Sequence, residues 1–382
     1  MVSKMNNIIR YIIVLQIILI GTPLFACTVF YAAQGDMILA GNNEDWMNPI
    51  TKVWFEPAEN GKYGRVFFGF DNFYPQGGMN EKGLFFDVTA ANLVEVPTNT
   101  AKPSFKGNLI RDKIMPECAT VKEAIRLFKQ YRAPHRWKAM YIIGDSSGDS
   151  AIIDPYGVIY KKGNYQVATN FYQSEVKSGE ISCERYKLAV AMLEKCNNIS
   201  VKYFREILAA THTEGDYINT LYSNIYDLKN GMIYLYHFHN YQNEVIIDFK
   251  EEIKMGRHSY DLPSLFPKTY AAESLISAYK KRKALNISDI DHQTYNELIG
   301  IYEMPSELAQ NTTLAVTKSG DKLYGFYPES PYDELLPISD NQFLSVSKSG
   351  VVRVTFNREK NGEATSLTVE TDKHNFTANK IK

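Results

Sequence analysis

The order of the predicted secondary structure constrains the fold of this chain more than any other feature of its sequence. Short strand-like runs dominate residues 28–88, two helical patterns follow between 108 and 131, and strand-like runs return between 140 and 170. Two further helical segments and three further strands fill residues 182–249. Strands with hairpin-length links form antiparallel sheets, which separate blocks of helices then cover. The sequence therefore predicts an α+β fold in which two sheets pack face to face between helical outer layers.

The helical segments have recognisable end and face signals. Thr120 has the side chain of an N-cap, and Glu123, three residues later, completes a capping box for a helix that runs to residue 131. Apolar residues recur along one face of that segment, as in an amphipathic helix. Residues 182–196 predict a longer helix and residues 201–210 a shorter partner.

The pattern changes near residue 265. A helical segment follows, and from residue 291 short strands alternate with Gly, Pro and Asn turns, which predicts a small all-β, barrel-like domain. Its expected core residues are Tyr302, Leu323, Phe343 and Phe356. The predicted division is a signal peptide at 1–26, a main domain at 27–265, a helical linker at 266–290 and the β domain at 291–382.

Residues 1–26 have the pattern of a secretory signal peptide. Lys4 and Arg10 supply a basic start, an apolar run follows at 12–20, and the small residue Ala26 precedes the expected cut. The apolar run is too short for a membrane span, which needs about 20 residues. We therefore expect a secreted or periplasmic protein whose mature chain begins at Cys27.

A cysteine at the start of a mature chain has two opposite interpretations. Its free α-amine, with an ordinary pKa of roughly 7.7–8.0, is a base that activates the thiol of the same residue. The run from Leu24 to Cys27 also resembles a bacterial lipobox, although Phe25 fits that motif poorly. In that case Cys27 would be lipidated and would anchor a binding module to the membrane.

Charge, cysteine count and histidine spacing limit the partners, cofactors and metals that we expect the protein to bind. The formal net charge is −1, so there is no basic surplus of the kind that nucleic-acid binding requires. We expect no nucleic-acid partner and no cofactor, and a homo-oligomer is possible. The chain has four cysteines, and no structural disulfide scaffold is expected. His237 and His239 are on one side of a predicted strand, but no third ligand with clear spacing accompanies them, so no metal site is predicted.

Five stretches of this chain follow one another in a recognisable order: Cys27-Thr28, Gly41 to Asp45, Gly78 to Leu84, Val167 to Asn170 and Ser182 to Tyr186. Together they resemble the choloylglycine hydrolase and penicillin V acylase superfamily of N-terminal-nucleophile (Ntn) hydrolases. That family runs Cys-Thr, then Gly-Arg-Asn-x-Asp, then a GMNEKGL stretch. The likeness spans residues 27 to about 250 and implies a four-layer αββα sandwich.

The resemblance also implies roles for individual residues. Cys27 would be the nucleophile, Asp45 would orient its amine, and Asn170 would donate a hydrogen bond to the developing oxyanion. Arg185 would support the constellation, and a cation so close is expected to lower the thiol pKa of Cys27. Taken singly, Asp45 and Asn170 also suit turns or caps, and Arg185 suits an exposed helix face.

Departures from the family pattern concern the substrate. Asn42 stands where the family has arginine, so the substrate preference of the family is not carried over. Asn42, Asn43 and Asn92 are the predicted substrate-binding residues. The family's second oxyanion asparagine falls near residues 89–91, and strand alternation would put Asn92 on the side of Ala90, so that either Asn92 or a backbone N–H would take its place.

The predicted function is hydrolysis of a linear, non-peptide amide C–N bond through an acyl-thioester on Cys27. The substrate would be a small-molecule amide with an acyl or aryl-acyl group. An acyltransferase of the same fold and a lipoprotein binding module lipidated at Cys27 are the alternatives. A papain-like enzyme is possible from composition, but Cys27 lacks the surroundings typical of that family.

Overall fold

The structure is a computed structural model of the chain. It describes residues 27–176, 180–215, 218–284, 292–306, 313–319, 322–326, 333–347, 350–359, 362–371 and 375–382. The predicted signal peptide lies outside the described residues. The chain divides into two compact units, one that ends at Tyr279 and one that runs from Lys280 to Lys382. In the described part of the chain, no helix combines the length and apolar character that crossing a bilayer requires.

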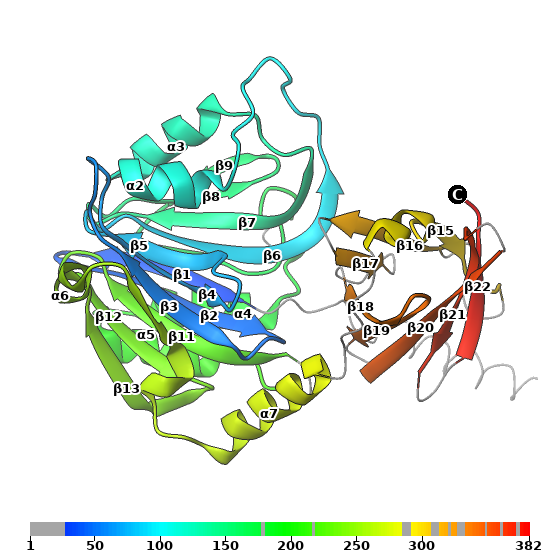
Figure 1. Ribbon diagram of the computed structural model, residues 1–382. Helices are drawn as coiled ribbons and strands as arrows, with labels where there is room; N and C mark the ends of the chain where they lie inside the picture. Colours follow the sequence, from blue (N-terminus) through cyan, green and yellow to red (C-terminus); the bar gives the residue numbers. More distant parts are fainter. Residues whose placement is uncertain are drawn as a thin grey trace, which may run out of the picture. The chain divides into compact units, whose positions relative to one another are not determined.

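The larger unit contains two antiparallel sheets that lie face to face (Figure 1). The six-stranded sheet has the order β10-β1-β2-β11-β12-β13 and the eight-stranded sheet the order β14-β3-β4-β5-β6-β7-β8-β9. The strands of the six-stranded sheet are β1 (Thr28–Gln34), β2 (Met37–Trp46), β10 (Tyr165–Ala168), β11 (Asn219–Asp227), β12 (Met232–His237) and β13 (Asn240–Asp248). Those of the other sheet are β3 (Thr51–Glu56), β4 (Arg65–Phe70), β5 (Pro75–Asn80), β6 (Phe85–Glu95), β7 (Arg136–Gly144), β8 (Ser150–Asp154), β9 (Gly157–Tyr160) and β14 (His258–Asp261).

Helices complete the outer layers. Those near the eight-stranded sheet are the π-helical η1 (Ile110–Ile114), α2 (Met115–Glu117) and α3 (Val121–Gln130), and those on the six-stranded sheet are α4 (Glu184–Lys195) and α5 (Val201–Ala210). After β13 come α6 (Phe249–Glu252), η3 (Ile253–Met255), η4 (Leu262–Leu265) and α7 (Tyr270–Ala284). The predicted capping box of α3 is confirmed, because the Thr120 hydroxyl accepts from the Glu123 backbone N–H and the Glu123 carboxylate accepts from that of Thr120.

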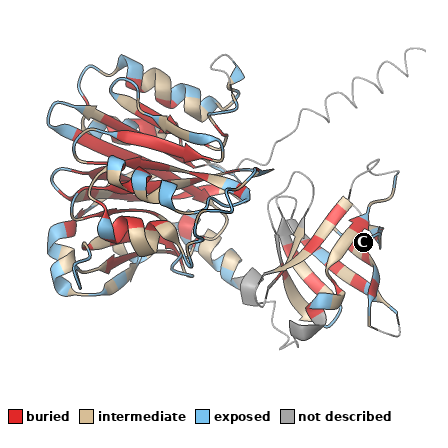
Figure 2. Ribbon diagram, turned by 90° about the horizontal axis from the view of Figure 1, so that it is seen from above, coloured by how far each residue is buried: buried red, intermediate tan, exposed pale blue. Residues whose placement is uncertain are grey.

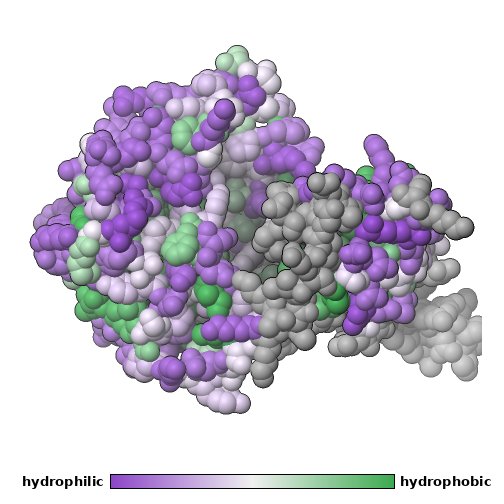
Figure 3. All heavy atoms as spheres, in the orientation of Figure 1, coloured by the Kyte–Doolittle hydropathy of each residue, from purple (hydrophilic) through white to green (hydrophobic). Residues whose placement is uncertain are grey.

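Side-chain alternation along β1 shows why a sheet in this position needs cover on both faces. Val29 and Tyr31 belong to the core between the two sheets, whereas Phe30 and Ala32 pack under α4 and α5. Buried residues accordingly run through the layered strands in Figure 2. On the face of this unit seen in Figure 3, hydrophilic side chains predominate and hydrophobic ones form small patches. The predicted four-layer sandwich is confirmed.

The smaller unit is a closed barrel of strands β15 to β22 in sequence order. Its elements are η5 (His292–Glu297), β15 (Gly300–Glu303), β16 (Thr313–Ser319), β17 (Lys322–Phe326), β18 (Asp333–Ser339), β19 (Gln342–Ser347), β20 (Gly350–Arg358), β21 (Ala364–Glu370) and β22 (Asn375–Lys380). Pairing of β15 with β22 closes the barrel, which removes exposed strand edges. The four core residues predicted for it are all fully buried.

Asn80 explains why the GMNEKGL stretch has its sequence. Its amide nitrogen donates to the carbonyls of Met115 and Cys118, both at 2.8 Å. Its side-chain oxygen accepts from the backbone of Lys82 and Leu84, and Gly83 has a positive φ of 79° that favours glycine. This motif therefore closes the β5–β6 turn and ties it to α2.

Candidate active site

The topology of the six-stranded sheet brings three of the predicted site residues together. Cys27 directly precedes β1, which pairs antiparallel with both β2 and β10. In antiparallel pairs the start of one strand lies beside the ends of its neighbours. Asp45, near the end of β2, and Asn170, two residues after β10, therefore flank Cys27. The Cys27 side chain is buried, and its Sγ lies 3.9 Å from the backbone oxygen of Asp45.

Arg185 joins these residues from a different layer. It lies in the first turn of α4, and its Nη1 donates to the Cys27 carbonyl oxygen at 3.1 Å and to the Thr28 hydroxyl at 2.9 Å. Its Nη2 donates to Asn170 Oδ1 at 3.1 Å. The same guanidinium is 3.6 Å from Asp45 Oδ2. One side chain thus contacts all three of the other predicted catalytic residues.

Asp45 is a buried carboxyl with several polar partners. Its oxygens accept hydrogen bonds from the hydroxyls of Thr213, at 2.9 Å, and of Thr220. Burial raises the Asp45 pKa to about 7, although the Arg185 charge and the two threonine hydrogen bonds oppose that rise. Sequence reasoning missed both threonines, since only the pairing of β11 with β2 brings Thr220 opposite Asp45.

The Cys27 thiol has a raised pKa, so the expected lowering is wrong. Burial is the largest cause, and the nearby carboxyls of Glu44, Asp45 and Asp87 add to it. Arg185 directs its hydrogen bond to the carbonyl oxygen of Cys27, on the main chain. The thiol therefore remains protonated near neutral pH and needs a base to become a nucleophile.

Glu44 is a buried acid that the sequence analysis did not single out. It follows Asn42 by two residues on β2, so both side chains are on the same side of the strand. Asn42 Nδ2 donates to Glu44 Oε2 at 3.4 Å. Burial raises the pKa of Glu44 to about 8, while hydrogen bonds from Asn42 and Cys27 lower it. Asn42, a predicted substrate-binding residue, is thus hydrogen-bonded to Glu44, an acid that lies beside the Cys27 thiol.

Asp87, on β6 of the opposite sheet, completes a buried pair of acids. Its Oδ1 accepts from the Val88 backbone at 2.9 Å, and its Oδ2 has no hydrogen-bond partner among the described residues. Burial raises its pKa, and the charge of Glu44 raises it further. Gly77 makes room for this carboxyl, because a Cβ there would lie 2.2 Å from Asp87 Oδ2. A lone acid in the run Phe85-Phe86-Asp87-Val88 was the available sequence signal.

The other two predicted substrate residues have different surroundings. Asn43 Nδ2 donates to Leu208 O at 3.0 Å and to the Thr211 hydroxyl at 3.2 Å, which ties β2 to α5 and the loop after it. Asn92 is exposed on β6, beyond the position of Ala90. The pairing of β6 with β7 shifts register between residues 90 and 94, so the strand alternation expected for Asn92 does not apply there.

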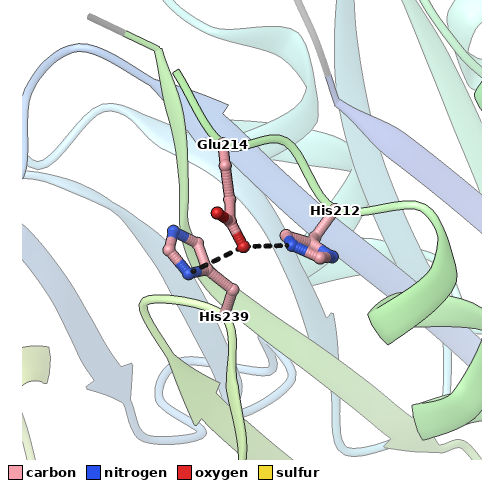
Figure 4. Close-up of side chains that lie close together, drawn as sticks. All are labelled: His212, Glu214 and His239. Carbon is pink, nitrogen blue, oxygen red and sulfur yellow. Dashed lines mark hydrogen bonds and ion pairs between the residues drawn. The ribbon is translucent and has the colours of Figure 1, made fainter. Parts of the chain in front are cut away.

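The prediction that His237 and His239 share one side of a strand is wrong, because β12 ends at His237 and His239 lies in the turn before β13. The His237 ring stacks on Phe266 with centroids 5.6 Å apart. His239 instead points toward Glu214 beside His212 (Figure 4). His212, Glu214 and His239 form the one group of three potential metal ligands found among the described residues.

Comparison with known proteins agrees with this architecture. The family model described as acyl-coenzyme A:6-aminopenicillanic acid acyl-transferase matches residues 34–241, more than half of the chain. A variant of the conjugated bile acid hydrolase from Clostridium perfringens is 16% identical with a TM-score of 0.51, over 64% of this chain and 99% of that one. For penicillin V acylase from Agrobacterium tumefaciens the identity is 16% and the TM-score 0.46, over 59% and 89%. No curated protein sequence matches the chain. The predicted superfamily resemblance is confirmed.

Proposed function

We propose, because the chain belongs to the acyl-coenzyme A:6-aminopenicillanic acid acyl-transferase family, that it breaks a linear amide C–N bond with Cys27 as the nucleophile. The observation that supports this most is the set of contacts made by Arg185 with Cys27, Asp45 and Asn170. Sheet pairing places Cys27, Asp45 and Asn170 together, and Arg185 reaches all three from α4, in a different layer. The burial of Cys27 supports a nucleophile over a lipid anchor, since a lipidated sulfur must direct its diacylglycerol away from the protein and into the membrane.

The proposed reaction begins once the peptide bond before Cys27 has been cleaved. The freed α-amine takes the thiol proton, and the resulting thiolate attacks the carbonyl carbon of the substrate amide. The C–N bond then breaks as the ammonium returns that proton to the leaving amine, which leaves an acyl-thioester. Water attacks the thioester, the amine accepts its proton, and the acid and the free thiol are released. A second amine in place of water would give acyl transfer.

The raised thiol pKa supports a base on the same residue. A thiol with a raised pKa forms little thiolate near pH 7 unless a base takes its proton. An α-amine with an ordinary pKa near 8 matches the proton affinity needed at neutral pH. Asp45, close to where this amine would form, is suited to hold its ammonium form in place.

The Asn170 side chain is the proposed oxyanion donor. Its Nδ2 donates to Ala90 O at 2.8 Å, so one N–H remains for a developing oxyanion, and Arg185 fixes its oxygen. Asn170→Ala is expected to lower kcat about 10²–10³-fold with a smaller change in KM. Steady-state kinetics measure both constants, and exposed Asn164, in the turn before β10, is the matched control. Unchanged kcat in Asn170→Ala would assign the oxyanion to other donors.

The acyl group is best found with a panel of amides. Penicillin V, bile-acid conjugates, N-acyl amino acids and acyl homoserine lactones are incubated with purified mature protein, with and without an added amine acceptor. Release of acid identifies a hydrolase, and a new amide identifies an acyltransferase. We expect an intact mass that begins at unmodified Cys27, as a secreted or periplasmic enzyme requires. Added diacylglycerol and fatty acyl mass would overturn the proposal in favour of a lipoprotein.

A further inference from the structure

Three potential metal ligands meet where the loop after α5 approaches the turn after β12 (Figure 4). Glu214 Oε1 lies 2.8 Å from His212 Nε2 and 3.8 Å from His239 Nδ1. One ligand atom from each residue lies within 4.8 Å of the others. We propose that His212, Glu214 and His239 bind a divalent transition-metal ion such as Zn²⁺, with a fourth position open to water.

The distances suit a tetrahedral ion. Zinc bonds of about 2.0–2.2 Å to imidazole nitrogen and carboxylate oxygen place neighbouring ligand atoms about 3.3 Å apart. The separations of Glu214 Oε1 from His212 Nε2 and from His239 Nδ1, 2.8 Å and 3.8 Å, lie on either side of that value. All three ligand atoms lie within 4.8 Å of one another, and metal binding would draw them toward the tetrahedral spacing. Two imidazoles and one carboxylate are also a ligand set that zinc favours over magnesium or calcium.

The ring of His212 already has the orientation that a ligand requires. Its Nδ1 lies 2.6 Å from the backbone oxygen of Ala209. A proton on Nδ1 satisfies that carbonyl, and a metal ion on Nε2 would replace the proton that Nε2 now donates to Glu214 Oε1 at 2.8 Å. Metal-binding histidines usually have such a carbonyl or carboxylate on the second ring nitrogen, because it selects the tautomer.

His239 reaches the group from a strained turn. Phe238 and His239 form the link between β12 and β13, with φ of 50° and 47°. Two-residue turns of this hand favour Asn and Gly, and bulky residues are disfavoured in the left-handed region. This turn has Phe238 and His239 instead, and it places the His239 imidazole beside Glu214.

Solvent access lets an ion reach this group. The Glu214 side chain is 65% exposed, so an ion can enter from solvent.

The ion would lie close to the proposed active site. His212 stands between Thr211, which accepts from Asn43, and Thr213, which donates to Asp45. A metal ion held by residues on both sides of Thr213 would fix this loop and, through Thr213, the position of Asp45. The site is therefore proposed as a support for the loop, separate from the acyl-transfer chemistry.

The test is Zn²⁺ titration of the untagged, chelator-treated mature chain against a competing chromophoric chelator. We expect one equivalent to bind, and a saturating excess near 100 times Kd to raise Tm by about 5 °C. His212→Ala and His239→Ala should each weaken binding at least tenfold and lose the Tm shift. Unchanged stoichiometry and affinity in both variants would overturn the proposal.

His258→Ala is the matched control. His258 Nε2 also lies 2.8 Å from a glutamate oxygen, that of Glu252, but this pair is not part of a three-ligand group in the described part of the chain. Binding should persist in this variant, and its loss there would contradict the assignment. Circular dichroism checks that each variant is folded. The zinc X-ray absorption spectrum of the unmutated protein gives a second measurement. It should show scattering from two imidazoles, and a spectrum without imidazole scattering would contradict the proposed ligands.

Discussion

Cys27→Ser is expected to reduce turnover of the best amide from the panel by at least about 10³-fold, with Tm within a few degrees of the parent. Losses of this order or larger follow when a catalytic nucleophile is replaced in comparable hydrolases. A seryl hydroxyl is far less acidic than a thiol, so an α-amine with a pKa near 8 deprotonates it poorly. The substitution keeps the side chain nearly isosteric, so little packing is lost. Initial rates and thermal unfolding on the same preparations measure both quantities.

Cys196→Ser is the matched control for that result. Cys196 lies at the end of α4, beside Ala32 and Gln34 at the far end of β1 from Cys27. Its rates should equal those of the parent. Intact mass must show that the Cys27→Ser chain still begins at residue 27, because a failure of cleavage would also remove activity. Parent-level turnover in a correctly processed Cys27→Ser chain would end the proposal of a cysteine nucleophile.

Glu44→Gln is expected to raise Tm at pH 8 by on the order of 10 °C and to change it little at pH 5. The folded-state pKa of Glu44 is about 8 against an ordinary 4.5. The folded protein therefore holds a proton on Glu44 that the unfolded chain releases, and stability falls as pH rises from about 4.5 to 8. A pKa shift of this size corresponds to a loss of on the order of 5 kcal/mol of folding free energy by pH 8. Glutamine has no charge to bury, so the variant does not suffer this loss.

The measurement is the difference in Tm between Glu44→Gln and the parent from pH 5 to pH 8. Carboxyls with a lowered pKa, such as Glu123, make stability rise with pH. They are present in both proteins, so their contribution cancels in the difference and that of Glu44 remains. Asp87 should contribute in the same direction as Glu44, because its pKa is also raised by burial. Exposed Glu59, changed to glutamine, is the control and should give a flat difference. A difference that is constant or falls with pH would show that Glu44 is not a buried acid.

Much of the fold could be predicted from local sequence signals. The capping box at Thr120 and Glu123 marks the start of α3, and the apolar period and turn residues locate α4, α5 and the strands within a few positions. Such signals depend on neighbours along the chain, so one sequence contains them in full. The order of those elements was enough to predict two covered sheets and a separate barrel. It also put Cys27 at the start of a strand.

Tertiary structure alone decided the electrostatics around that cysteine. Asp87 comes within reach of Glu44 only because two sheets stack, and the two residues are on different strands of different sheets. Arg185 was expected to lower the thiol pKa, but desolvation by both sheets, together with these carboxyls, raises it. The reason is physical: a pKa depends on the solvent and charge that surround the folded group, and no local pattern encodes either. The meeting of His212, Glu214 and His239 has the same origin, in a turn and a loop that only the assembled sheet brings together.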